Sequence, residues 1–135
     1  MSEIQILNQF KNSLTSFFDE LIELFPHEAD LIMIRIFLKD QINIKDVMDI
    51  FYYNLNKNDQ ELKKMIKEKN ESFFLENSLF DNFSKGKVLH FKQLWNSPVL
   101  DKENKSMVWK WVDSFVLISE KYNKQLRTPS SEENM

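Results

Sequence analysis

The sequence predicts an all-α fold: a single compact bundle of five to seven helices with a broadly apolar C-terminal helix. The 135 residues include only 1 glycine and 3 prolines, against average shares of roughly 7% and 5%. A many-stranded fold needs more turn-forming residues than this. Apolar residues also recur at spacings of three and four along most of the chain, which is the helical period. Because a chain of this length suits one core, we expect residues 1–124 to form a single helical domain.

The first helix has the clearest apolar stripe. Its members alternate at spacings of three and four and are Leu7, Phe10, Leu14, Phe17, Leu21 and Leu24. Pro26 is expected to end this helix. The stripe is long enough for about three heptads of a coiled-coil seam, which is the alternative interpretation. Its width favours a helix that faces the core of its own chain.

A second helix is predicted from about Glu28 to Lys39. Its centre, LIMIRIFL (Leu31–Leu38), is apolar nearly all round, so a buried strand is the competing interpretation. No partner strand is predicted elsewhere, which favours a helix. Because its apolar residues surround the axis, we expect this helix to be packed on two sides.

Two further helices are predicted from their caps and stripes. Asn43 is a candidate N-cap for a third helix with the stripe Ile44, Val47, Met48, Phe51 and Leu55. Asn58, with Glu61 three residues later, is a candidate N-cap for a fourth helix. Its stripe is Leu62, Met65, Ile66 and Phe73.

The second half is expected to begin with a long connection at Asn77–Lys87, which holds the single glycine. A short fifth helix with Val88, Phe91 and Trp95 then ends at Asn96–Pro98. Asp101 is a plausible cap for the sixth helix, which we expect to run to about Lys124. Residues 125–135 are polar and aperiodic, which predicts a disordered tail.

The last helix carries two tryptophans, Trp109 and Trp111, about 200° apart on the helical wheel. Trp111 lies on one stripe with Phe115 and Ile118, and Trp109 lies on another with Val112 and Val116. The helix is therefore apolar over a broad arc. Two interpretations fit this pattern. In the first, both tryptophans belong to the core. In the second, Trp109, Val112 and Val116 form a partly exposed anchor for a protein partner.

The residues with catalytic or metal-binding chemistry are few. The chain has no cysteine and two histidines, His27 and His90, which are far apart in sequence. No spacing typical of a zinc or calcium site is present, and no nucleophile is flanked by an obvious base. We therefore expect no enzyme, no catalytic or metal-ligating residue and no cofactor.

Nucleic acid is an alternative partner because the second half is rich in lysine. The candidate contacts are Lys63, Lys64, Lys67, Lys85, Lys87 and Lys92, with Phe91 and Trp95 interleaved. Yet the chain has just two arginines, Arg35 and Arg127, and its sequence pI is about 5.4. These observations argue against strong phosphate binding and favour a solvated lysine face.

The composition also bears on location and self-association. No apolar run approaches the roughly 18 residues of a membrane span, no secretory signal is present, and the lack of cysteine suits a reducing compartment. We expect an intracellular protein with no membrane partner. Twelve phenylalanines and three tryptophans are a large load for one core, so a homo-oligomer with exposed aromatic residues is one expectation. Residues 1–60 are acidic and residues 61–124 basic, and the halves either attract each other between copies or neutralise each other within one monomer.

Two blocks carry a resemblance to known proteins: FFDELIELFPHEADLIMIRIFLKDQI (Phe17–Ile42) and KVLHFKQLWNSPVLDKENKSMVWKWVDSFVLISEKY (Lys87–Tyr122). They resemble short uncharacterised proteins of nucleocytoplasmic large DNA viruses, the giant viruses. The resemblance implies a viral origin and a place in the virion or in the cytoplasm or nucleus of the infected cell. It implies no activity and transfers no functional residue.

The function expected on these grounds is non-enzymatic binding of a viral or host protein, in virus assembly or against a host factor. The alternative is a nucleic-acid-associated factor. A further alternative is the architecture of the poxvirus apoptosis regulators, helical proteins that bind host signalling proteins around an apolar central helix. That similarity is one of fold alone.

Overall fold

The computed structural model describes residues 2–76 and 92–127, and these ranges form helices and turns without a strand. The predicted all-α bundle is thereby confirmed. The helices are α1 (Glu3–Leu24), α2 (Ala29–Asp40), α3 (Ile44–Lys67), α4 (Glu71–Glu76) and α6 (Lys102–Arg127). Residues 92–95 add a single helical turn before α6.

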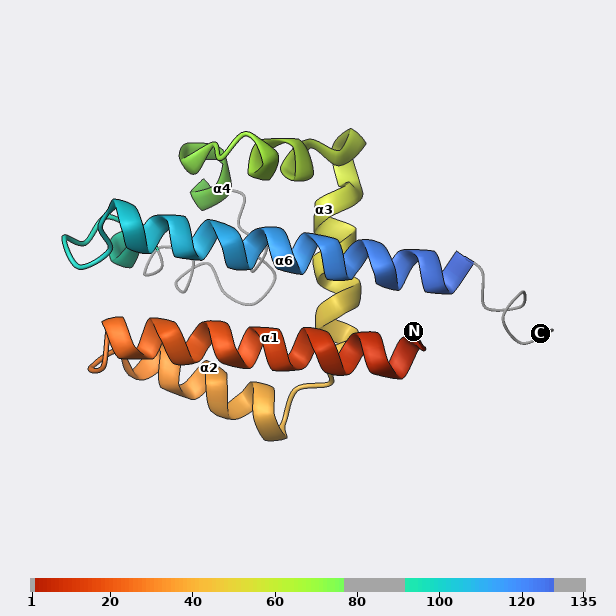
Figure 1. The fold of residues 1–135 in the computed structure, drawn as a ribbon, viewed down its shortest axis with the longest axis horizontal. Helices are drawn as coiled ribbons and strands as arrows, with labels where there is room; N and C mark the ends of the chain where they lie inside the picture. Colours follow the sequence, from red (N-terminus) through yellow and green to blue (C-terminus); the bar gives the residue numbers. More distant parts are fainter. Residues whose placement is uncertain (1, 77–91, 128–135) are drawn as a thin grey trace.

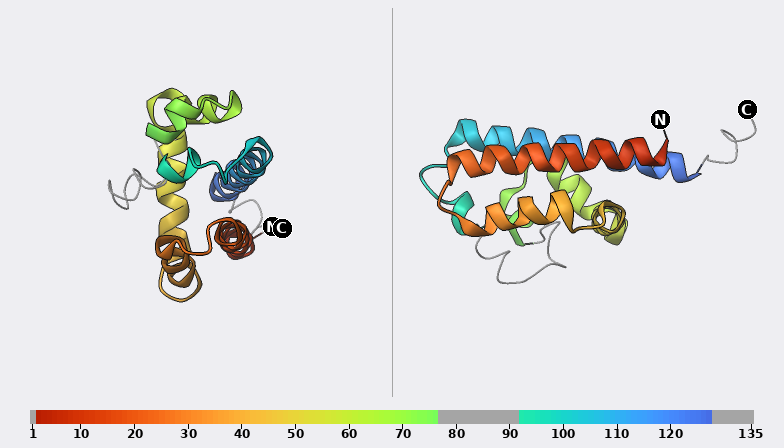
Figure 2. Two further views of the ribbon diagram at one scale, coloured as in Figure 1. Left: turned by 90° about the vertical axis from the view of Figure 1, so that its left-hand side faces the viewer. Right: turned by 90° about the horizontal axis from the view of Figure 1, so that it is seen from below.

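The bundle is built around the pair α1 and α6, which lie side by side and run in opposite directions (Figure 1). α3 crosses this pair at a steep angle, as the end-on view in Figure 2 shows. α1 contacts α2, α3 and α6, and α3 also contacts α6 and α4. The core therefore lies between the α1–α6 pair and α3.

α1 begins at a capping box and presents its apolar stripe to the core. The Ser2 side chain accepts a hydrogen bond from the Gln5 amide at 3.2 Å, and Gln5 Oε1 accepts one from the Ser2 amide at 2.9 Å. The buried side chains of α1 are Ile6, Leu7, Phe10, Leu14, Phe17, Phe18 and Leu21. The helix faces its own core, as the width of the stripe predicts, and ends before Pro26.

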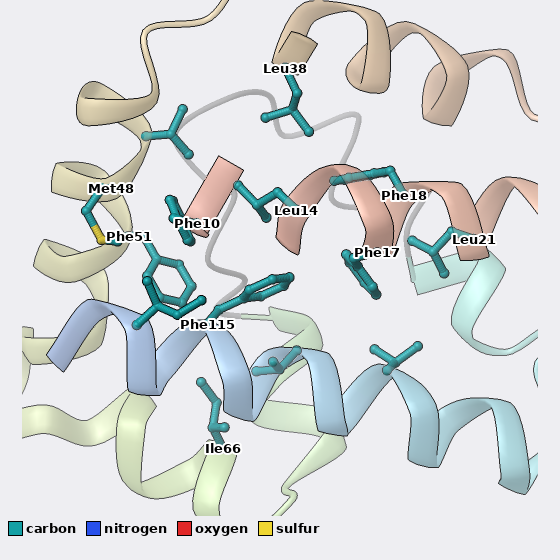
Figure 3. Packing of buried hydrophobic residues seen from close by; sticks show 14 of the residues in the cluster. Phe10, Leu14, Phe17, Phe18, Leu21, Leu38, Met48, Phe51, Ile66 and Phe115 are labelled. Carbon is teal, nitrogen blue, oxygen red and sulfur yellow. The ribbon is translucent and has the colours of Figure 1, made fainter. Parts of the chain in front are cut away.

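Three phenylalanines meet where α1, α3 and α6 cross. The ring centroids of Phe10 and Phe51 are 5.6 Å apart, and the Phe115 ring lies edge-on to both at 6.1 and 6.4 Å (Figure 3). Phe17 makes a further edge contact with Phe115 at 5.6 Å. Such tilted and edge-to-face pairs add about 0.5–1.5 kcal/mol each beyond the area they bury. This cluster fixes the crossing of the three long helices.

α2 differs from its prediction because it packs on one side only. Leu31 and Leu38 are its buried residues, and Figure 3 shows Leu38 directed toward α1. Among the described residues, its main contact is with α1. The helix itself is confirmed, but the expectation of a second packed face is wrong for this part of the chain.

α3 contains the predicted break but not the predicted cap. Its Asn43 cap is confirmed, since Oδ1 accepts a hydrogen bond from the Lys45 amide at 3.0 Å. The helix is interrupted at Lys57–Gln60, where Asn58 has φ 53° and ψ 46°. An N-cap residue is extended, so Asn58 is not the cap of a new helix. The segment after the break ends at Lys67, and Phe73 belongs to α4, whose first turn is capped by Asn70.

α6 is capped and doubly packed as predicted. Asp101 Oδ1 accepts a hydrogen bond from the Asn104 amide at 2.9 Å, and the helix contacts α1 and α3. It continues to Arg127, past the expected end near Lys124. The expected connection at 77–87, Val88 and Phe91 of the expected fifth helix, and residues 128–135 of the expected tail lie outside the described residues.

Candidate interaction surface

Four large apolar residues are exposed together on the outer face of α2. The exposed fractions are 38% for Ile32, 51% for Met33, 49% for Ile36 and 37% for Phe37. Their spacing of one, four and five positions places them on one side of the helix, opposite the buried Leu31 and Leu38. We call these four residues the α2 strip. It is the apolar surface that the two-sided pattern of the sequence predicted to be buried.

The centre of the α2 strip is uncharged because the one charged residue among its neighbours is turned away. The Arg35 guanidinium Nε donates a hydrogen bond to Asp19 Oδ1 of α1. Charges on α2 are otherwise confined to its ends, with Asp30 in the first turn and Lys39 in the last turn, followed by Asp40. The ion pair also fixes α2 against α1, so the strip is held in a defined orientation.

Other exposed apolar residues of the described chain are distributed singly. They are Ile4, Tyr53, Val99, Leu117 and Leu126. Scattered residues of this kind are normal on protein surfaces, whereas a contiguous apolar face marks a binding surface. The α2 strip is therefore the stronger candidate.

The predicted anchor residues of α6 lie mainly inside the protein. Trp109 is 6% exposed and Val112 3% exposed, and Val116 is half-buried. The Trp109 ring packs edge-on against the ring of Trp95, with the centroids 5.8 Å apart. The structure therefore shows Trp109 in the core, and the exposed anchor position that the alternative required is not found. Binding of a partner at these three residues stays a prediction.

Trp111 is the more accessible of the two tryptophans. It is half-buried, and its Nε1 donates a hydrogen bond to Glu20 Oε2 on α1 at 2.7 Å. Its ring stacks on Phe115 at 6.2 Å. The sequence assigned Trp111 to the core stripe with Phe115, so the exposures of the two tryptophans are the reverse of the anchor hypothesis.

The lysines proposed for nucleic acid do not form one free basic surface in the described residues. Lys63 Nζ lies 2.7 Å from Glu120 Oε1, and Lys64 Nζ lies 3.6 Å from Asp59 Oδ2. Lys67 is exposed and Lys92 is half-buried. Lys85 and Lys87 lie outside the described ranges. Both carboxylate pairs reduce the positive charge that this face offers to phosphate.

A polar cluster joins α1, α3 and α6 near the N-terminus of α1 and the C-terminal part of α6. Lys45 Nζ donates hydrogen bonds to Tyr122 Oη at 2.7 Å and to Glu3 Oε1 at 3.3 Å. These hydrogen bonds raise the pKa of the Lys45 ammonium above its usual value of 10.5. Tyr122 Oη donates to Asp49 Oδ1 at 2.9 Å, and burial raises the pKa of its phenol above 10.0. The cluster stabilises the fold, and it contains no arrangement of nucleophile and base.

A shallow depression with a volume of about 510 Å³ lies between α1 and α6. Glu20, Glu103, Ser106, Met107, Lys110, Trp111 and Ser114 line it. Its rim mixes carboxylates with a lysine, so it has no single charge to select a ligand. In residues 2–76 and 92–127, no three His, Asp or Glu side chains are grouped as metal ligands.

The α2 strip lies within LIMIRIFL, a run whose apolar pattern predicts burial on two sides. Apolar residues on both sides of a helix fit equally a helix packed on both sides and a helix with one open face. The exposure of the α2 strip is the observation that separates them, and it depends on the tertiary structure.

Comparison with known proteins adds no relative: no family model, no curated protein and no solved structure matches this chain. The resemblance to giant-virus proteins and the architectural similarity to poxvirus apoptosis regulators therefore stay predictions. Within the described ranges, none of the helices combines the length and the apolar character of a membrane span.

Proposed function

We propose that this chain is a non-enzymatic protein that acts by binding another protein molecule through the α2 strip, as a component of virus assembly or against a host factor. The observation that carries the proposal is the strip itself, four large apolar side chains exposed together on one helix. Leaving this surface in water costs free energy that a protein partner recovers, at about 25 cal/mol per Å² of apolar area. The Arg35–Asp19 pair supports the proposal, because it removes the neighbouring charge from the contact.

A site-specific photo-crosslink tests the proposal inside infected or expressing cells. Met33 is replaced by a photoreactive benzoyl-phenylalanine, and Leu117, an exposed apolar residue of α6, is replaced in a matched control. We expect discrete protein adducts from position 33 that are absent from position 117. Adding Ile36→Lys to the position-33 variant is expected to abolish them, since it places a charge in the strip. The same adducts from both positions, or none from position 33, would contradict the proposal.

Nucleic-acid binding is the second candidate, favoured by Lys67, which is exposed on the basic segment after the break in α3. Titration with single- and double-stranded DNA and RNA at two salt concentrations separates it from protein binding. Tight binding that weakens steeply with salt would favour nucleic acid. We expect weak binding, because Glu120 and Asp59 partly neutralise the neighbouring lysines.

A further inference from the structure

We propose that the break in α3 is a hinge, and that opening it lets two copies of this chain exchange halves in a domain-swapped dimer. In that dimer α3 is one continuous helix over Ile44–Lys67. Residues 61–76 and 92–127 of each copy then pack on residues 2–56 of the other. The exchange involves the core and the break, so it does not depend on the α2 strip. Three features of the structure support it.

The first feature is the backbone of the break. Asn58, Asp59 and Gln60 follow one another at φ 53°, 58° and 62°. Residues with a Cβ visit this left-handed region as single residues, because the Cβ lies too close to the following carbonyl oxygen. All three residues are exposed, and their polar contacts with Asn56 and Lys64 are exposed pairs that contribute little. The segments on either side of the break therefore impose its conformation.

The second feature is a sequence that is compatible with a continuous helix. Sharp kinks usually occur at proline or glycine, and Lys57–Gln60 contains neither. The apolar stripe of α3 also keeps its phase across the break. Leu55 and Leu62 are seven positions apart, which is about two helical turns, and Ile66 follows four positions later. In a straight α3 these residues lie on one face, with Asn58 as the polar position between them.

The third feature is the attachment of the segment after the break to α6. Leu62 and Ile66 are 4% and 2% exposed, and Figure 3 shows Ile66 directed toward α6. Lys63 Nζ lies 2.7 Å from Glu120 Oε1 of α6. Figure 1 shows the chain turning toward α4 at this end of α3. When α3 straightens, the segment after the break and α6 therefore move together, away from α1.

A second copy covers the core that this movement exposes. In a lone chain with a straight α3, Phe10 and Phe17 of α1 would lose the Phe115 ring, which lies 6.1 and 5.6 Å from theirs. A second copy in the same state presents the same surfaces, so the contacts between the two halves form again between copies without a new surface. The dimer gains two relaxed breaks, and this gain opposes the loss of freedom on association.

Two matched variants of the break shift this equilibrium in opposite directions. Asn58, Asp59 and Gln60 are replaced together by alanine, which favours a continuous helix, or together by glycine, which relieves the left-handed turn and weakens a helix. We expect the dissociation constant of the dimer to fall by about tenfold or more in the alanine variant and to rise by a similar factor in the glycine variant.

Light scattering coupled to size-exclusion chromatography measures the dimer. Each protein is held at its urea midpoint, so that the halves separate, and is refolded at about 10–500 µM. The monomer has a mass of 16.3 kDa. An alanine variant that stays monomeric would overturn the proposal, and so would equal dimer fractions in the alanine and glycine variants. If the alanine variant does not refold, the parent decides: no dimer in the parent at any concentration also overturns it.

Cross-linking distinguishes an exchange of halves from a contact between surfaces. Glu20 of α1 and Lys110 of α6 line the same depression and belong to different halves, and the chain has no native cysteine. A Glu20→Cys/Lys110→Cys double variant is treated with a short bismaleimide, and its chains are separated under denaturing conditions. In the swapped dimer the link joins two chains, whereas in the monomer it stays within one. An isolated dimer that gives within-chain links alone would overturn the proposal.

The response of the dimer to salt gives a further test. The halves of a swapped dimer separate only when the core opens, so the isolated dimer should persist after dilution and at high salt. A dimer that dissociates rapidly when salt is added would contradict the exchange, in favour of a contact between the acidic and basic halves of two copies.

Discussion

The phenolic oxygen of Tyr122 accepts a hydrogen bond from Nζ of Lys45 at 2.7 Å, across 77 positions of sequence. The contact joins the C-terminal part of α6 to the first turn of α3. Tyr122 is 1% exposed, and its hydroxyl also donates to Asp49 at 2.9 Å. One buried hydroxyl thus satisfies a cation and an anion from the same helix, which locks α6 against α3.

Tyr122→Phe is expected to lower the free energy of unfolding by about 1–2 kcal/mol, since both hydrogen bonds involve charged groups. The cost stays moderate because Lys45 and Asp49 are half exposed and can bind water instead. Urea denaturation measures the change. Tyr53→Phe is the control, since Tyr53 is 64% exposed and should show no effect. If the two substitutions changed the free energy of unfolding equally, the Tyr122 hydroxyl would have no specific role in stability.

Stability should fall as the pH rises above about 10. Burial raises the pKa of Tyr122, and hydrogen bonds to Tyr122 and Glu3 raise the pKa of Lys45. The folded state therefore keeps both protons at pH values where the unfolded chain has lost them. The stabilisation is complete below the unfolded-state values of 10.0 and 10.5 and is lost as the pH rises toward the folded-state values.

Urea midpoints measured between about pH 8 and pH 11 test this dependence. The decline should be shallower in Tyr122→Phe, which lacks the phenol proton and removes the strongest contact of Lys45. Parallel curves for the parent and the variant would show that other groups cause the decline.

The long helices could be predicted from the sequence because burial imposes a helical period on it. Leu14 of α1 and Phe115 of α6 lie on the predicted stripes and are 2% and 1% exposed. The caps at Asn43 and Asp101 were equally predictable, since each needs one side-chain oxygen and the amides two or three residues later.

The remaining features depend on contacts between distant segments. The apolar pattern of the sequence does not distinguish Trp109 from Trp111. Trp109 is the buried one because the ring of Trp95 packs against it. The outer face of α2 is open because, among the described helices, its main contact is with α1, on the side of Leu31 and Leu38. Periodicity describes a single helix and carries no information on which of its faces receives a neighbour.

Trp109→Ala should be the most destabilising tryptophan substitution of α6, with a cost of about 3–5 kcal/mol. Trp109 is buried against Trp95, and truncation leaves a cavity between α6 and the preceding turn. Trp111→Ala should cost about 1–2 kcal/mol less than Trp109→Ala, because Trp111 is only half-buried and less apolar area is lost. Chemical denaturation of both variants gives the comparison. The opposite order would place Trp111 at the core and return Trp109 to the role of a surface anchor.

The break in α3 can be tested with glycine substitutions at two adjacent positions. They are expected to change the free energy of unfolding in opposite directions. Gln60 has φ 62°, a left-handed conformation that costs an ordinary side chain about 1–2 kcal/mol and glycine almost nothing. Gln60→Gly should therefore raise the free energy of unfolding by about 0.5–1 kcal/mol, after the added entropy of the unfolded chain is subtracted. Its neighbour Glu61 lies past the non-helical residues and is also exposed.

Glu61→Gly is the matched control and should lower the free energy of unfolding by about 1 kcal/mol, the usual cost of glycine inside a helix. Thermal and urea unfolding of the two variants measure the difference. The single hydrogen bond that Gln60 gives to Asn56 at 3.2 Å is exposed, so its loss should not reverse the sign. If both substitutions destabilise the protein equally, α3 is a continuous helix in solution, and the turn of its C-terminal segment toward α4 requires another cause.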